Sequence, residues 1–117
     1  MKALEDLVQN FASSVAGQAD AIQAGDPKKG NVLARRYIAA FEQIRGYGDP
    51  GREALAALLT HQNRDVRVMA AAYLIRYCEK LAKAVLKREA KGSGLTAFGA
   101  KQALQRWKEG TWTLDPE

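Results

Sequence analysis

Residues 59–75 are the segment that most constrains the fold. A short helix ends near Leu59, a polar turn follows, and a second, mostly apolar segment runs from Val66 to Ile75. Apolar residues cover nearly the whole circumference of that second segment, which is typical of a helix packed on several sides. Two helices joined by a short turn form a hairpin that buries its apolar face only against neighbouring hairpins. The segment therefore predicts an all-α chain of stacked hairpins.

Stop signals and apolar spacing divide the rest of the chain into helices. Glycine-containing breaks lie at 25–27, 46–51, 92–94 and 110. Between them, apolar residues recur with the three- and four-residue spacing of a helix face. The predicted helices are about 3–24, 27–45, 55–59, 63–75, 79–90 and 96–108. These six helices predict about three hairpins in a right-handed α-α superhelix, forming one domain of residues 1–110 with a tail of residues 111–117.

The last two predicted helices have distinct faces. Helix 79–90 places Leu81, Ala82, Val85 and Leu86 on one face and Lys80, Lys83, Lys87 and Lys91 on the other. Helix 96–108 carries the apolar residues Phe98, Leu104 and Trp107. We expect both apolar faces to be buried against the neighbouring helices.

Composition excludes several classes of protein. Cys78 is the single cysteine and His61 the single histidine, so neither an internal disulfide nor a zinc site is expected. Acidic residues at positions 5 and 6 argue against a signal peptide, and no apolar run approaches the ~20 residues of a membrane span. We therefore expect a cytoplasmic protein with no membrane contact.

Candidate catalytic and cofactor motifs are weak. Gly46, Gly48 and Gly51 match the letters of a dinucleotide-binding fingerprint, but a helix precedes them where that fingerprint needs a strand. His61 has no motif linking it to a nucleophile, so a turn or capping role is expected, and Cys78 is expected to be a small buried apolar residue. We expect no catalytic residue, no cofactor and no metal.

Part of the chain resembles a known repeat. Asp65-Val66-Arg67, followed by Ala70-Ala71 and Leu74, resembles the second helix of a HEAT-type repeat. Beyond it, the chain resembles a family of small bacterial HEAT-like proteins classed as a domain of unknown function, through Gly25-Asp26, Asn31, Arg52, Ala54-Leu55, residues 58–61, Ala103-Leu104, Trp107 and Gly110. The resemblance implies a HEAT/armadillo-like fold. It also implies a setting similar to that of bacterial immunity proteins, which neutralise a toxin by binding it.

Arg67 is expected to be structural. Its guanidinium group suits hydrogen bonds to backbone carbonyls and to Asp65 or an acidic side chain of the adjoining hairpin. In HEAT-like repeats the matching arginine typically holds neighbouring helices together.

Exposed basic and aromatic residues are the candidates for binding. A formal net charge of +5 favours an acidic protein partner, such as a toxin, or nucleic acid. The candidates are Arg35, Arg36, Tyr47, Lys80, Lys83, Lys87, Lys91 and Trp112. Trp112 either folds back over the last hairpin or offers an exposed anchor. We expect a non-catalytic protein-binding module of the immunity-protein or antitoxin kind; the alternative is a nucleic-acid-binding protein that contacts phosphates without reading bases.

Overall fold

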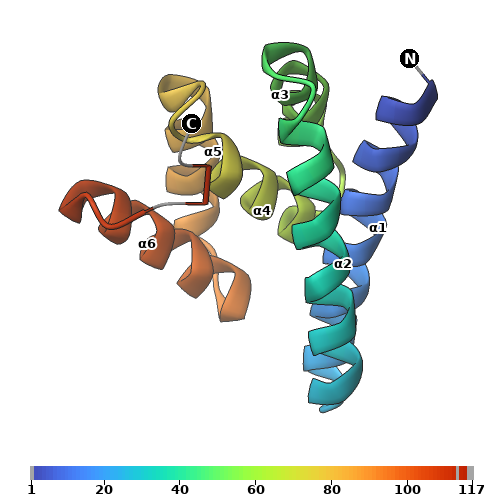
Figure 1. Cartoon of the computed structure of the whole chain (residues 1–117). Helices are drawn as coiled ribbons and strands as arrows, with labels where there is room; N and C mark the ends of the chain where they lie inside the picture. The colour runs from blue at the N-terminus through green and yellow to red at the C-terminus, as the bar shows by residue number, and fades with distance from the viewer. Residues whose placement is uncertain (1, 113, 116–117) are drawn as a thin grey trace. The chain divides into compact units, whose positions relative to one another are not determined.

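All regular secondary structure is helical in the residues that the computed structural model describes, which are 2–112, 114 and 115 (Figure 1). This part of the chain forms six α-helices and one short 3₁₀ helix, Ala57–Thr60, connected by turns, and it contains no strand. The predicted all-α class and the six helices are confirmed, and the helical hairpins are of the kind that build α-α superhelices. The chain divides into two compact units, residues 1–57 and 58–117.

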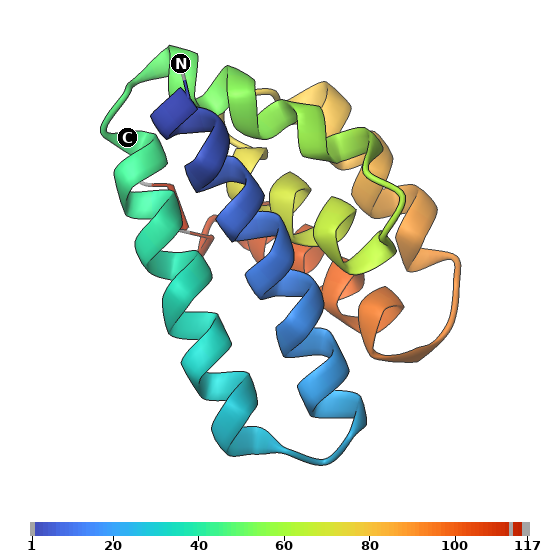
Figure 2. The ribbon, with the colours of Figure 1, turned by 90° about the vertical axis from the view of Figure 1, so that its right-hand side faces the viewer.

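The first unit is a helical hairpin with a short third helix. Helices α1 (Lys2–Gln23) and α2 (Pro27–Arg45) run antiparallel and pack along their length, as Figure 2 shows, and α3 (Asp49–Ala56) packs against both. Asp26 caps α2 by accepting a hydrogen bond from the Lys29 amide, and Pro27 occupies the first helical turn. The fully buried side chains of the unit include Phe11, Val15, Phe41, Ile44 and Leu55.

The second unit is built around α4 (Arg64–Leu74). The Asn63 side chain caps α4 by accepting hydrogen bonds from the amides of Asp65 and Val66. Helices α5 (Glu79–Ala90) and α6 (Gly94–Glu109) form a hairpin, and both pack against α4. Gly110, in the left-handed conformation with φ 76°, ends α6. Within the described residues, no helix is both long and apolar enough to cross a membrane.

Two local predictions need correction. The segment 46–51 is expected to be a connector, yet α3 begins at Asp49, because a proline at position 50 suits the first turn of a helix. Leu81 and Phe98 are expected on buried faces but are exposed. The buried face of α6 is instead formed by Ala97, Ala100 and Ala103, whose small side chains let the neighbouring helices approach closely.

Candidate partner-binding surface

The net positive charge of the chain lies in its second unit. Residues 58–117 carry eleven lysines and arginines against six aspartates and glutamates, a net charge of +5, whereas the seven basic and seven acidic residues of 1–57 cancel. Between Glu79 and Glu109 the only acidic residue is Glu89. The α5–α6 hairpin is therefore the most basic part of the molecule.

The lysines predicted on the exposed side of α5 are not all available to a partner. Lys83 lies 2.6 Å from the carboxylate of Glu79, one turn before it, and its side chain is only 34% exposed. The pKa of Glu79 lies below its ordinary value, mainly because Lys83 donates a hydrogen bond to the carboxylate and secondly because Lys83 is positively charged. Lys80, Lys87 and Lys91 are exposed, and none of them forms an ion pair with another described residue. These three lysines, which we call the α5 lysine stripe, are the side chains available to a partner.

Glu89 faces the opposite way and is buried. Its carboxylate accepts hydrogen bonds from Nε and Nη2 of Arg67, at 3.2 and 2.9 Å, and from Nε of Arg64 at 3.3 Å. Burial alone would raise the pKa of Glu89, but the hydrogen bonds and charges of Arg67 and then Arg64 outweigh it and hold the pKa below the ordinary value of 4.5. Its negative charge is thus used inside the unit and does not offset the α5 lysine stripe.

The two arginines also fix the turns at this end of the unit. Arg67 donates to the backbone carbonyls of His61 and Gln62, and Arg64 donates to the carbonyl of Ser93. Of the two acidic partners considered for it, Arg67 contacts Glu89, the acidic side chain of the adjoining hairpin, while Asp65 accepts a hydrogen bond from the Thr96 hydroxyl at 2.6 Å. These contacts join the start of α4 to the α5–α6 turn and hold the hairpin in place.

His61 and Cys78 have local roles. Nδ1 of His61 accepts a hydrogen bond from the Asn63 amide at 3.0 Å, within the turn before α4. Cys78 is half-buried, and burial raises the pKa of its thiol, which keeps the group in its less reactive protonated form. In the described part of the chain, no group of three or more His, Cys, Asp or Glu side chains is placed to hold a metal ion.

Arg35 and Arg36 lie on α2, in the first unit. Both are exposed, as are Lys28 and Lys29 on the same helix, and none of the four forms an ion pair within residues 2–112, 114 and 115. Together they give α2 a basic outer side. The first unit as a whole carries no net charge, because its acidic residues balance these four side chains and its other basic residues.

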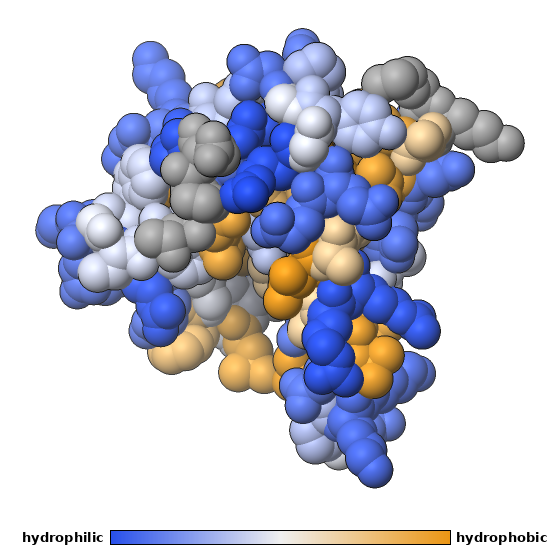
Figure 3. All heavy atoms as spheres, viewed as in Figure 1, coloured by the Kyte–Doolittle hydropathy of each residue, from blue (hydrophilic) through white to orange (hydrophobic). Residues whose placement is uncertain are grey.

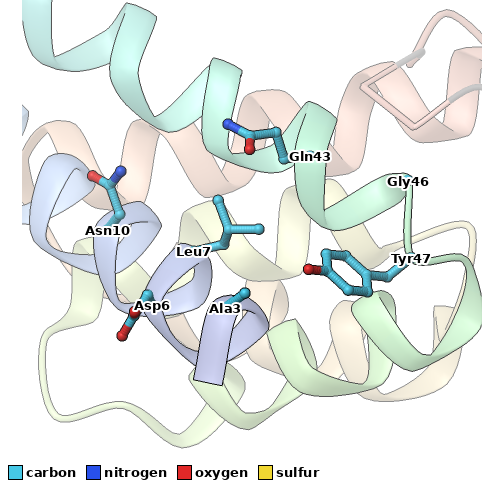
Figure 4. Close-up of a pocket in the computed structure, with 7 residues that line it drawn as sticks. All are labelled: Ala3, Asp6, Leu7, Asn10, Gln43, Gly46 and Tyr47. Atoms are coloured by element: carbon cyan, nitrogen blue, oxygen red, sulfur yellow. The ribbon is translucent and has the colours of Figure 1, made fainter. Parts of the chain in front are cut away.

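Tyr47 lines an open hollow between the ends of α1 and α2, with a volume of about 640 Å³ (Figure 4). Its ring and the side chain of Leu7 point into the hollow, and Asp6, Asn10 and Gln43 supply the polar part of its wall. Helical spacing places Ala3, Leu7 and Asn10 on one side of α1, but no sequence signal pairs them with Tyr47.

Trp112 folds back onto the helices instead of standing exposed, but its hydrogen bond is to α4 and not to the last hairpin. The indole N–H donates to the carbonyl of Ala72 at 2.7 Å, and the ring is half-buried. Arg76 donates to the backbone carbonyl of Asp115, whose carboxylate is buried beside the same arginine. Residues 113, 116 and 117 of the predicted tail, and Met1, lie outside the described residues.

Sequence reasoning missed two exposed apolar residues of α6. Leu95 is 70% exposed and Phe98 58% exposed. Their three-residue separation places them side by side on the helix, away from the alanines at 97, 100 and 103. The regular spacing of those alanines could have identified the buried side of α6, because small side chains on one side of a helix allow close packing against its neighbours.

Comparison with known proteins shows the fold. No protein-family model and no curated protein sequence matches the chain. The chain is similar to the crystal structure of the protein RPA1889 from Rhodopseudomonas palustris CGA009, with a TM-score of 0.85 and 24% sequence identity over 92% of this chain and 90% of that chain. At this level of identity the likeness establishes a shared helical fold.

Proposed function

We propose that this protein is a non-catalytic protein-binding module whose partner presents an acidic surface to the second unit. The observation that carries the proposal is the α5 lysine stripe: Lys80, Lys87 and Lys91 are exposed and unpaired within the described residues. Of the two acids on the same helix, Glu89 is buried and held by arginines, and Glu79 is paired with Lys83. Such a surface attracts acidic groups over a distance and disfavours basic ones.

The biological role that we propose is that of a bacterial immunity protein or antitoxin. The support is the resemblance of Asp65-Val66-Arg67 and the segments around it to small bacterial HEAT-like proteins. In this role the protein acts by steric occlusion, covering an acidic surface that its partner needs for activity. The mechanism requires no reacting group on this chain.

Affinity capture with charge-reversed variants tests the proposal. The immobilised protein should retain an acidic protein from an extract of its native cells at physiological salt. A variant with Lys80→Glu, Lys87→Glu and Lys91→Glu should lose that protein. Lys83 is left unchanged, because reversing it would place two acids one turn apart with Glu79 and weaken the helix itself.

The matched control changes the same number of charges in the first unit, through Lys28→Glu, Lys29→Glu and Arg36→Glu. It should retain the partner. Recovery of no protein by the unmodified chain would contradict the proposal, and equal loss in both variants would show that the α5 lysine stripe does not determine binding. A captured toxin should be inhibited by the unmodified protein and not by the α5 variant.

Nucleic-acid binding remains the alternative, because unpaired lysines along one helix also suit a phosphate backbone. Capture that disappears after nuclease treatment would favour it. Affinity for random duplex DNA should then fall steeply as salt rises, and the absence of any binding at low salt would exclude it.

A further inference from the structure

The first two turns of α6 carry an apolar surface that the fold does not use. Leu95 and Phe98 are 70% and 58% exposed, whereas Ala97, Ala100 and Ala103 are buried. In Figure 3, apolar residues reach the surface at the lower edge of the region where α6 begins. Side chains of this size left in water on a fixed helix are a feature of interaction sites when polar groups surround them.

Basic residues flank this apolar pair in the sequence. Lys91 lies four residues before Leu95, and Lys101 lies three residues after Phe98. Both lysines are exposed, and neither has an ion-pair partner in the part of the chain that the structure describes. The segment 91–101 therefore combines two exposed apolar side chains with uncompensated positive charge, and it begins at Lys91, the last residue of the α5 lysine stripe.

The backbone that presents this surface is held in place. Arg64 donates to the carbonyl of Ser93, and the Thr96 hydroxyl donates to Asp65 at the start of α4. Residues 93 and 96 bracket Leu95, so the first turn of α6 is tied to α4 from both sides. A preorganised anchor of this kind loses little conformational entropy on binding.

We propose that Leu95 and Phe98 are the apolar anchor of the partner-binding surface, and that they bind an acidic protein segment carrying apolar side chains. The apolar side chains of the segment cover Leu95 and Phe98, and its carboxylates pair with Lys91 and Lys101. The inference rests on the proposed function and specifies the chemistry of the partner. A phosphate backbone would offer Leu95 no complementary apolar group. A lipid bilayer is also a poor fit, because helices that lie in a bilayer present a wider apolar face than two side chains.

Peptides of equal length test this chemistry without the natural partner. One peptide combines glutamates with a leucine face, a second replaces each leucine by alanine, and a third replaces each glutamate by lysine. Titration followed by amide NMR should give shifts at residues 91–101 with the first peptide, much weaker shifts with the second, and none with the third. Equal binding of the first two peptides would show that the apolar pair contributes nothing.

Paired variants assign the effect to these side chains. Leu95→Gln and Phe98→Gln together should weaken binding of the first peptide at least tenfold, since burial of each side chain contributes strongly to association. Glutamine keeps a good helix propensity, so the fold is expected to remain. The control, Val32→Gln with Ile38→Gln, changes two exposed apolar residues of α2 and should leave binding unchanged. Equal weakening by the control would overturn the assignment.

The remaining outcomes separate this inference from the proposed function. If the α5 charge reversals abolish partner capture while Leu95→Gln and Phe98→Gln leave it unchanged, the protein-binding function stands and the anchor is wrong. If random duplex DNA binds and no acidic peptide does, both fail. Binding to phosphatidylglycerol-containing vesicles that depends on Leu95 and Phe98, without peptide binding, would identify a lipid surface as the occupant and overturn the inference.

Discussion

At the scale of single residues, the buried carboxylate of Glu89 is paired with arginines inside the second unit and does not neutralise the exposed lysines of α5. A carboxylate that is only 9% exposed requires charged hydrogen-bond donors, and Arg67 and Arg64 supply them from α4. The same contacts direct these two arginines of α4 toward Glu89 on α5, so this carboxylate does not offset the exposed lysines of α5. Within Asp65-Val66-Arg67, Arg67 thus contacts α5 and the turn before α4, whereas Asp65 contacts Thr96 of α6.

Loss of the Glu89 carboxylate should destabilise the protein. We expect Glu89→Gln to lower the free energy of unfolding by about 3 kcal/mol, because it leaves two arginines without their shared counter-charge in a largely buried site. Urea denaturation measures the change. The control is Glu109→Gln, at an exposed position on α6, which should change stability by less than about 0.5 kcal/mol. A similar effect at both positions would contradict the role assigned to Glu89.

The Glu89 carboxylate should make the free energy of unfolding depend on pH in the acidic range. The pKa of Glu89 in the folded protein lies below its ordinary value of 4.5, so the unfolded chain takes up the proton first as the pH falls. The stabilisation is therefore complete above the unfolded pKa and is lost as the pH falls through the folded value. Unfolding free energies measured from about pH 6 to about pH 3 should decline less for Glu89→Gln than for the unmodified protein. Parallel declines would contradict this assignment.

At the scale of elements, two helical glycines have opposite roles. A Cβ at Gly51 in α3 would lie 2.0 Å from the backbone oxygen of Ile44 in α2, so only glycine allows these helices to approach this closely. A Cβ at Gly99 in α6 would meet no atom within 4 Å. The position of α3 thus depends on the absence of a side chain at residue 51.

Alanine substitutions should distinguish the two positions. Gly51→Ala should destabilise the first unit by about 2 kcal/mol or more, since a backbone oxygen cannot move without shifting a helix. Gly99→Ala, the matched control, should stabilise α6 by about 0.5–1 kcal/mol through helix propensity. Thermal unfolding followed by circular dichroism measures both effects. Tolerance of Gly51→Ala would show that the α2–α3 contact is looser than described.

At the scale of the whole molecule, charge is unevenly distributed along the chain. All of the net charge of +5 belongs to residues 58–117, and the first unit is balanced. Long-range attraction to an acidic partner should therefore depend on the second unit. Such attraction chiefly raises the rate of association and is screened by salt.

Association kinetics should reveal this asymmetry. With an acidic partner or the acidic peptide described above, the association rate should fall markedly between low and physiological salt. Reversal of Lys80, Lys87 and Lys91 should remove most of that dependence, while the control reversals at residues 28, 29 and 36 should preserve it. The dissociation rate should change less with salt in every case. A salt dependence unchanged by the α5 reversals would place the attraction elsewhere.

The amino-acid sequence by itself determined the local features of this protein. Helix periodicity, the caps at Asp26 and Asn63, and the stop at Gly110 depend on residues close together in the chain, so five of the six helices begin and end near their predicted limits. The same spacing places Lys80, Lys87 and Lys91 on the exposed side of α5, although it wrongly assigns Leu81 to the buried side. Short-range backbone geometry and side-chain pattern are sufficient for such features.

Only the tertiary structure decided which surfaces are buried and which charged side chains are paired within the molecule. Helical spacing marks two apolar sides of α6, one with the alanines at 97, 100 and 103 and one with Leu95 and Phe98. Packing buried the first side and left the second exposed to water. The pairing of Glu89 with Arg67 joins residues 22 positions apart, and the contact of Trp112 with Ala72 joins residues 40 apart. Contacts over such separations depend on how helices meet, which no local pattern specifies. The packing of the helices therefore determines the two features on which the proposed binding rests, the unpaired lysines and the exposed apolar pair.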